Sequence, residues 1–181
     1  MKALVLIDIQ NDYFPGGKME LVDSEQAAEH ARRLLASFRA NKAPVFHVQH
    51  LSTRPGATFF LADTDGVNLH NRVLPCQGEA IVSKNYPNAF YETTLLRQLR
   101  ELEVDTLYFS GMMTHMCVDT TVRAAFDFGF TCLVAHDACA TRDLTFNGKN
   151  VAADQVQTAY MAALNGMFAK VERTEILCQE L

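Results

Sequence analysis

The sequence predicts an α/β protein in which a parallel β-sheet is covered by helices on both faces. Two observations lead to this prediction. Short runs of β-branched and apolar residues alternate along the chain with longer segments whose apolar residues recur at helical spacing, which is typical of repeated strand–helix–strand units. Most strand candidates are also continuously apolar, as expected for strands that are buried on both faces.

Six segments have the composition of such strands. Each is a short apolar or β-branched run, and polar residues lie at the ends of these runs. The segments are Ala3–Asp8, Pro44–Gln49, Ala80–Ser83, Asp105–Ser110, Thr131–Ala135 and Lys170–Arg173.

Four segments between or after the strands show helical periodicity. In Ser24–Asn41 the apolar residues fall at i, i+4, i+7, i+8 and i+11 and form one stripe. Asp23 and Gln26 are placed to cap the start of this helix. Similar spacing predicts helices over Tyr91–Leu102, Thr114–Phe128 and Val151–Phe168.

One long segment, Leu51–Glu79, has no sustained period and is rich in Gly, Pro, Asp, Asn and Thr. It is longer than most loops inside compact domains. We interpret it as a lid or pocket wall with Phe59 and Phe60 as lid residues, because two adjacent phenylalanines are costly to leave in water. A tolerated surface insertion is the alternative.

Composition and charge exclude several classes of protein. With 181 residues, 49% of them hydrophobic and 20% charged, the chain predicts one globular domain over residues 1–181. Its net charge of −5 and lack of a Lys/Arg run argue against a nucleic-acid partner. The apolar run Ala3–Ile7 is far too short for a signal or membrane segment. We therefore expect a cytoplasmic protein with no membrane partner.

The cysteines do not form a disulfide or zinc pattern. They are odd in number and include no C-x-x-C pair, so we expect mostly free thiols. The five are Cys76, Cys117, Cys132, Cys139 and Cys178.

Three chemically active residues are expected at the carboxyl edge of the sheet, where ligands bind in doubly wound folds. Asp8 closes the first strand, Lys84 closes the third, and Cys117 lies just inside the helix after the fourth. A carboxylate base, a cation and a thiol together suit acyl transfer at a carbonyl. A structural Asp8–Lys84 ion pair and an inert, packed Cys117 are the alternatives.

The segment before Cys117 predicts a thiolate. A strand end, a glycine turn and Thr114 as N-cap would place the sulfur in the first turn of a helix. Unpaired N–H groups at that position lower a cysteine pKa and can also hold an oxyanion.

Metal and dinucleotide sites are weaker hypotheses. His47, His50, Asp63 and His70 form one conceivable ligand set, but their spacing matches no zinc pattern. No G-x-G-x-x-G follows the first strand, which disfavours a dinucleotide site. We expect neither a metal nor a cofactor.

Three separated segments resemble the signature segments of the isochorismatase-like cysteine hydrolases. They are Leu6–Phe14, Ser83–Phe90 and Ser110–Val118. The resemblance runs nearly end to end and includes His136–Thr141. It implies a three-layer α/β/α fold with a six-stranded, mostly parallel, Rossmann-like sheet, and a homodimer or homotetramer.

The same resemblance implies a catalytic triad of Asp8, Lys84 and Cys117. It also implies a cis peptide bond between Met112 and Met113, which would place the Met113 N–H beside that of Cys117 to form an oxyanion hole. Nearness to these segments predicts further substrate-binding residues beside Phe59 and Phe60. These are Gln10, Phe14, Tyr86, Phe90 and His115.

The expected reaction is hydrolysis of a C–N bond in a small amide, ureide or carbamoyl compound through a thioester. In this family, isochorismatases proper cleave a vinyl ether without a cysteine nucleophile, so Cys117 favours C–N hydrolysis. Nicotinamidases resemble one another in an Asp-x-His…His metal site after the second strand, where this chain has His47-Val48-Gln49-His50-Leu51.

Three alternatives stay open. One is a metal-assisted, nicotinamidase-type amidase. Another is a catalytically idle protein that binds a small molecule on the same fold. The third is a thiol redox enzyme in which Cys132 or Cys139 resolves an oxidised Cys117.

Overall fold

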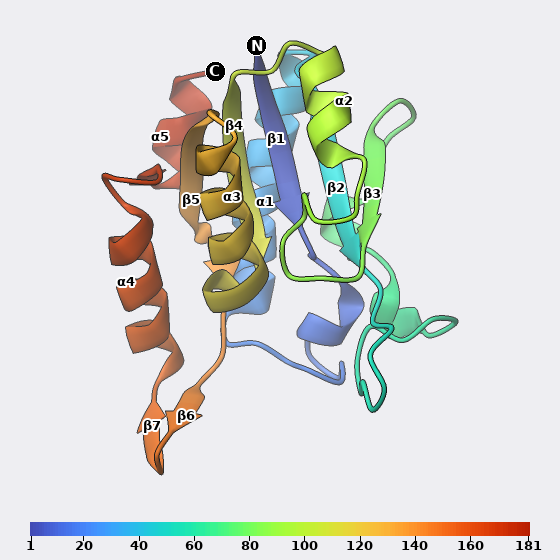
Figure 1. Cartoon of the computed structure of the whole chain (residues 1–181), viewed down its shortest axis with the longest axis vertical. Coiled ribbons are helices and arrows are strands. Elements are labelled where there is room, and N and C mark those ends of the chain that lie inside the picture. The colour runs from blue at the N-terminus through green and yellow to red at the C-terminus, as the bar shows by residue number, and fades with distance from the viewer.

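A six-stranded parallel sheet forms the centre of the molecule. The computed structural model describes residues 1–181 (Figure 1). The strands lie in the order β3-β2-β1-β4-β5-β8, and every neighbouring pair is parallel. Their bounds are β1 Lys2–Ile7, β2 Val45–His50, β3 Ala80–Lys84, β4 Thr106–Met112, β5 Thr131–Ala140 and β8 Lys170–Glu172. The fold class predicted from the sequence is confirmed.

Helices cover both faces of the sheet (Figure 1). One face carries α1 and α5, and the other carries α2, α3 and α4. Two clusters of 24 and 23 buried residues fill the two interfaces. The helices are α1 Ser24–Ala40, α2 Leu95–Glu101, α3 Asp119–Asp127, α4 Ala153–Leu164 and α5 Thr174–Gln179.

Strand β1 shows why the central strands are continuously apolar. Ala3, Val5 and Ile7 enter the core under α2, α3 and α4, whereas Leu4 and Leu6 enter the core under α1. Successive side chains of a strand alternate between faces, and both faces here are covered. Every position of β1 beyond its first residue must therefore be apolar until the strand ends.

A small hairpin and a terminal helix are absent from the sequence prediction. Strands β6 (Leu144–Phe146) and β7 (Lys149–Val151) form a separate antiparallel sheet, which projects from the lower end of the molecule in Figure 1. The helix expected from Val151 begins at Ala153 because Val151 pairs with Leu144. Helix α5 follows β8 and packs beside α1.

Two other helix predictions need correction. The helix expected from Tyr91 begins at Leu95. The helix expected over Thr114–Phe128 is divided into a π-helix at Thr114–Val118 and α3.

The expected cap of α1 is wrong. Asp23 has a left-handed backbone with φ +55° and makes no side-chain capping bond.

The long segment between β2 and β3 folds back over the sheet edge instead of forming a loose surface insertion. It contains two short 3₁₀ turns, Asp65–Val67 and Asn71–Val73. Within it, Phe60 is 1% exposed and belongs to the core under α1. This burial favours the pocket-wall interpretation over the surface insertion.

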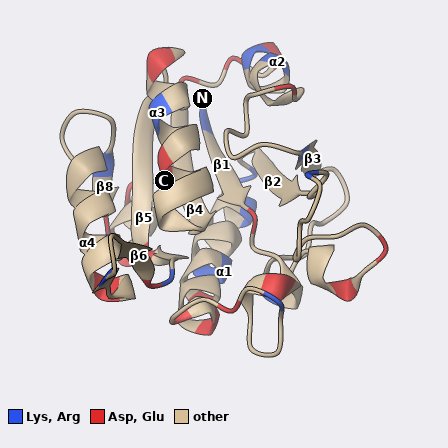
Figure 2. Ribbon diagram, turned by 60° about the horizontal axis from the view of Figure 1, so that its bottom comes forward, with Lys and Arg blue, Asp and Glu red and all other residues tan.

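Charged residues are distributed over the whole ribbon. Figure 2 shows Lys and Arg interspersed with Asp and Glu along the ribbon. No helix is long and apolar enough to cross a membrane.

Candidate active site

Asp8, Lys84 and Cys117 come together at the carboxyl edge of the sheet. Asp8 directly follows β1, Lys84 is the last residue of β3, and Cys117 lies in the π-helix after β4. The Lys84 Nζ lies 2.7 Å from a carboxylate oxygen of Asp8 and donates to the Cys117 Sγ at 3.3 Å. All three residues are buried. One ammonium group therefore joins the carboxylate to the sulfur.

The close approach of β1 and β4 positions two of these residues. Ile7, which precedes Asp8, pairs with Gly111 in β4. Gly111 has a φ of +139°, and a Cβ at this position would overlap the backbone of Ile7. Glycine thus lets the chain leave β4 beside Asp8. The Met112–Met113 peptide bond that follows is cis.

The electrostatics of Cys117 differ from the sequence prediction. Burial, followed by the Asp8 carboxylate, raises the pKa of the Cys117 thiol, and Lys84 offsets only part of this effect. Thr114 does not cap a helix, because its hydroxyl bonds to Gln157 and to the Ala140 carbonyl. The expectation of a resting thiolate is therefore wrong. The sulfur needs a neighbouring base, and Asp8 is in place to be one.

Lys84 is held in its ammonium form. Burial lowers its pKa, but the charges of Asp8 and Cys117 more than offset burial, so the pKa lies above its usual value. An ammonium group has three protons to donate and no lone pair. Asp8 and Cys117 take two of these contacts, and the third is to His50 Nδ1 at 2.9 Å.

His50 is fixed in place by Gln10. The Gln10 side-chain amide donates to the His50 carbonyl at 2.9 Å and accepts from the His50 N–H at 2.7 Å. Burial and the Lys84 charge lower the His50 pKa to about 4, so the ring is neutral near pH 7. Gln10, predicted to bind substrate, instead orders the end of β2.

A small pocket of about 260 Å³ opens onto Cys117. Its walls are mainly aromatic and aliphatic, as is usual for sites that bind small molecules. The predicted residues Phe59 and Phe60 lie in this wall, beside Tyr13. The other lining residues are His50, Ser52, Arg54, Pro55, Gly56, Ala57, Pro87 and Met116.

Asp12 holds the aromatic wall together. Its buried carboxylate accepts from the N–H groups of Phe60 and Lys18, which joins the long loop to the turn after β1. Gly66 packs so closely that a Cβ there would overlap the Asp12 carboxylate. Tyr13, next in the chain, packs edge-on against Phe60 at 4.6 Å between ring centroids. Phe60 is therefore a fixed wall residue and not a mobile lid.

Two predicted pocket aromatics lie elsewhere. Phe14 stacks on His70 at 3.6 Å between ring centroids and faces a different cavity. Phe90 packs in the core against Phe128. Each is the last residue of a signature segment, but both side chains pack away from the Cys117 pocket.

Two further predicted pocket residues also lie outside it. Tyr86 is 38% exposed and packs edge-on against Tyr91. His115 bonds through Nδ1 to Thr141 at 2.6 Å. Neither residue lines the pocket at Cys117.

Sequence reasoning missed Tyr13, Met116 and Arg54 as pocket residues. Met116 could have been predicted, because it directly precedes Cys117 in the sequence. Tyr13 and Arg54 could not, because their positions depend on how the long loop folds over the turn after β1.

The conceivable metal set is not assembled. The His47 Nε2 contacts Glu79 at 2.8 Å, and His70 stacks on Phe14. A compact group with ligand geometry does exist, formed by Asp8, His50 and Cys117. The Lys84 ammonium contacts all three members. This group already surrounds a cation, so the residues present do not fit a resident metal ion.

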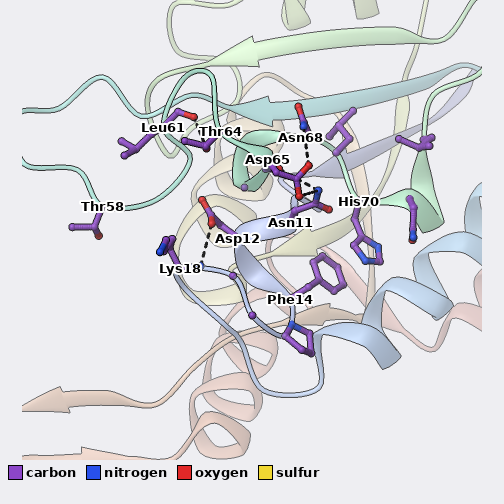
Figure 3. Close-up of a pocket in the computed structure, with 17 residues that line it drawn as sticks. Asn11, Asp12, Phe14, Lys18, Thr58, Leu61, Thr64, Asp65, Asn68 and His70 are labelled. Carbon is purple, nitrogen blue, oxygen red and sulfur yellow. Dashed lines mark hydrogen bonds between the residues drawn. The ribbon is translucent and has the colours of Figure 1, made fainter.

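A second, larger cavity lies against the turn that follows β1 (Figure 3). It measures about 710 Å³, and no member of the Asp8–Lys84–Cys117 group lines it. Several of its polar groups bond to one another: Asn11 and Asn68 both donate to Asp65, as the dashed lines show. We call it the outer groove.

Comparison with known proteins identifies relatives across nearly the whole chain. The family model "Isochorismatase domain" matches residues 2–176. An uncharacterized isochorismatase family protein of Bacillus subtilis is 50% identical, over 96% of each chain. A streptothricin hydrolase of Streptomyces noursei is 32% identical, over 80% of this chain and 51% of its own length. The crystal structure of a protein from Oleispira antarctica assigned to the isochorismatase hydrolases superposes with a TM-score of 0.95 at 47% identity, over 98% of this chain and 96% of that one.

Proposed function

Because the chain belongs to the isochorismatase family of hydrolases, we propose that it hydrolyses the C–N bond of a small amide, ureide or carbamoyl compound through a thioester on Cys117. One observation carries the proposal. The Lys84 Nζ contacts both the Asp8 carboxylate and the Cys117 sulfur, and that sulfur lines a small, mainly apolar pocket. Hydrolysis is also the reaction for which the streptothricin hydrolase is named.

The first half-reaction uses Asp8 as the base. Asp8 accepts the Cys117 proton while the sulfur attacks the carbonyl carbon, and a C–S bond forms. Because burial raises the pKa of the Cys117 thiol, its proton is best transferred to Asp8 while the sulfur attacks, and not before. The backbone N–H groups of Met113 and Cys117 are the proposed donors to the oxyanion.

The second half-reaction regenerates the enzyme. As the C–N bond breaks, Asp8 returns its proton to the departing ammonia or amine, which leaves a thioester. Asp8 then takes a proton from water, the hydroxyl adds to the thioester carbonyl, and the C–S bond breaks. That proton finally returns to the sulfur. Lys84 stays charged throughout, so each change of charge at Asp8 or Cys117 occurs beside a fixed cation.

The test is ammonia release from a panel of short amides, ureides and carbamoyl compounds. We expect Cys117→Ala to lower kcat by about 10⁴-fold or more. The matched control is Cys76→Ala, which removes an exposed thiol outside the site and should match the wild type. Turnover in Cys117→Ala at the wild-type rate would exclude the thioester route. If the wild type releases no ammonia from any member of the panel, a binding role on this fold becomes the better account.

A further inference from the structure

Four side chains that line the Cys117 pocket can donate a hydrogen bond. The Ser52 hydroxyl can also accept one, and the other three donors are Tyr13, His50 and Arg54. None of the three uses its pocket-side polar atoms in a hydrogen bond or ion pair within the chain. No Asp or Glu lines the pocket. The side chains of the pocket therefore offer more donors than acceptors.

Tyr13 is the most enclosed of the three donors. Its side chain is 1% exposed, and its ring packs against both Phe59 and Phe60. Burial, then the charges of Cys117 and Asp8, raise the Tyr13 pKa well above its usual value, so the hydroxyl keeps its proton. Buried tyrosine hydroxyls normally find a partner, and this one has none in the protein.

His50 has its donor position set by Lys84. The Lys84 ammonium can only donate, so the His50 Nδ1 at 2.9 Å must accept. The neutral ring then carries its single proton on Nε2. That N–H has no bonding partner in the chain, and the ring lines the pocket.

Arg54 adds a full positive charge at the exposed side of the pocket. It forms no ion pair with any Asp or Glu of the chain. Asp8, behind the pocket, is already paired with Lys84 at 2.7 Å. The pocket thus combines two neutral donors with one unpaired cation.

We infer that Tyr13, His50 and Arg54 select substrates that carry a carboxylate on the acyl side of the scissile amide. When a substrate enters, it displaces the water that accepted hydrogen bonds from these donors. A good substrate must therefore offer acceptor atoms to the same donors. A carboxylate supplies several lone pairs and pairs with a guanidinium. This inference rests on the proposed C–N hydrolysis and names its substrate class: short monoamides of dicarboxylic acids.

The direct test compares succinamate with butyramide, two four-carbon amides that differ by a terminal carboxylate. We expect kcat/KM to favour succinamate by about tenfold or more. Arg54→Met and Tyr13→Phe should each reduce this ratio. Lys18→Met, which removes a cation of the outer groove, is the matched control and should keep the wild-type ratio.

The role of His50 can be separated from its contact with Lys84. His50→Gln places an amide near the Nε2 position and should keep much of the preference. His50→Asn places an acceptor near Nδ1, keeps the Lys84 contact and should lose the preference. A mainly structural role for His50 would instead be rescued by Asn and not by Gln.

A second readout needs no turnover. Succinate and butyrate are compared for their ability to protect Cys117 from iodoacetamide, with peptide-resolved detection. We expect succinate to protect at a concentration about tenfold lower, and Arg54→Met to remove that advantage. Protection without amide turnover would refute the proposed hydrolysis while supporting carboxylate recognition. A succinamate-to-butyramide ratio near one, or a ratio that survives both Arg54→Met and Tyr13→Phe, overturns this inference.

Discussion

The Cys117 pocket and the outer groove differ in size and in how their polar groups are used. The outer groove is larger, about 710 Å³ against about 260 Å³ for the Cys117 pocket. In the groove, Asp65 accepts from Asn11 and Asn68. In the pocket, by contrast, Lys84 joins a carboxylate to a thiol, and neighbouring donors face the cavity without partners.

This difference shows that volume does not locate the chemistry. Polar groups that bond to one another have little left to offer a ligand, whereas buried groups without partners are costly unless something binds them. The outer groove is lined by an aspartate, a lysine, a phenylalanine and a histidine, and the same four residue types lie in or directly behind the wall of the Cys117 pocket. Matched substitutions in the two cavities therefore test the contrast directly.

The aspartates should show the largest contrast. Asp8→Asn removes the proposed base, and we expect kcat to fall by about 10²–10⁴-fold. Asp65→Asn in the outer groove keeps one acceptor oxygen and loses the other, and because Asp65 lies outside the Asp8–Lys84–Cys117 group the variant should leave kcat unchanged. Steady-state ammonia release measures both. Equal losses in the two variants would mean that the cavities share the chemistry.

The lysines should differ in both rate and stability. Lys84→Met leaves Asp8 as a buried charge without a partner, so we expect the free energy of unfolding to fall by about 3–5 kcal/mol. Reaction of Cys117 with iodoacetamide at neutral pH should slow as well. Lys18 is exposed, and Lys18→Met should change stability by less than about 0.5 kcal/mol. Urea unfolding and the rate of Cys117 alkylation are measured for both lysine variants. A Lys84→Met protein with wild-type stability and wild-type Cys117 reactivity would contradict the prediction.

The phenylalanines separate pocket contact from general packing. Phe59→Ala opens the pocket wall and should raise KM about tenfold. Phe14→Ala should lower the free energy of unfolding by about 3 kcal/mol without changing KM, because Phe14 is buried against His70 in the groove. Unchanged KM in both Phe59→Ala and Phe60→Ala would show that the aromatic wall does not contact substrate.

The smallest difference is expected between the histidine variants His50→Asn and His70→Asn, in how the free energy of unfolding changes with pH. The His50 pKa is about 4 in the folded protein and near 6.5 when unfolded. Between pH 4 and pH 6.5 the unfolded state therefore binds more protons than the folded state does. The free energy of unfolding falls as the pH drops from 6.5 to 4. His50→Asn should flatten this slope more than His70→Asn, whose pKa burial also lowers. Urea unfolding at pH 7 and pH 5 provides the slopes, and equal slopes in the two variants would contradict this assignment.

The sequence predicted the sheet and the meeting of Asp8, Lys84 and Cys117 for a physical reason. Parallel strands that are buried on both faces are continuously apolar, and their carboxyl ends share one edge. Polar residues at those ends must therefore lie close together. The hairpin was also open to prediction, because Asn147-Gly148 between two short strands is a strong turn signal.

Other features of the site depend on contacts between distant segments. Tyr13 and Phe60 meet because Asp12 accepts from the Phe60 N–H, 48 positions away. The raised pKa of Cys117 reflects burial by several elements, whereas the sequence indicated only the start of a helix. Neither local periodicity nor motif spacing contains this information.

The most direct test of the central claim is acid-quenched peptide mass spectrometry during turnover of the best amide in the panel. The account predicts that the peptide containing Cys117 gains the mass of the acyl group, and that Cys76 and the other thiols do not. Steady turnover with an unmodified Cys117 peptide at every quench time, together with activity in Cys117→Ala, would contradict it.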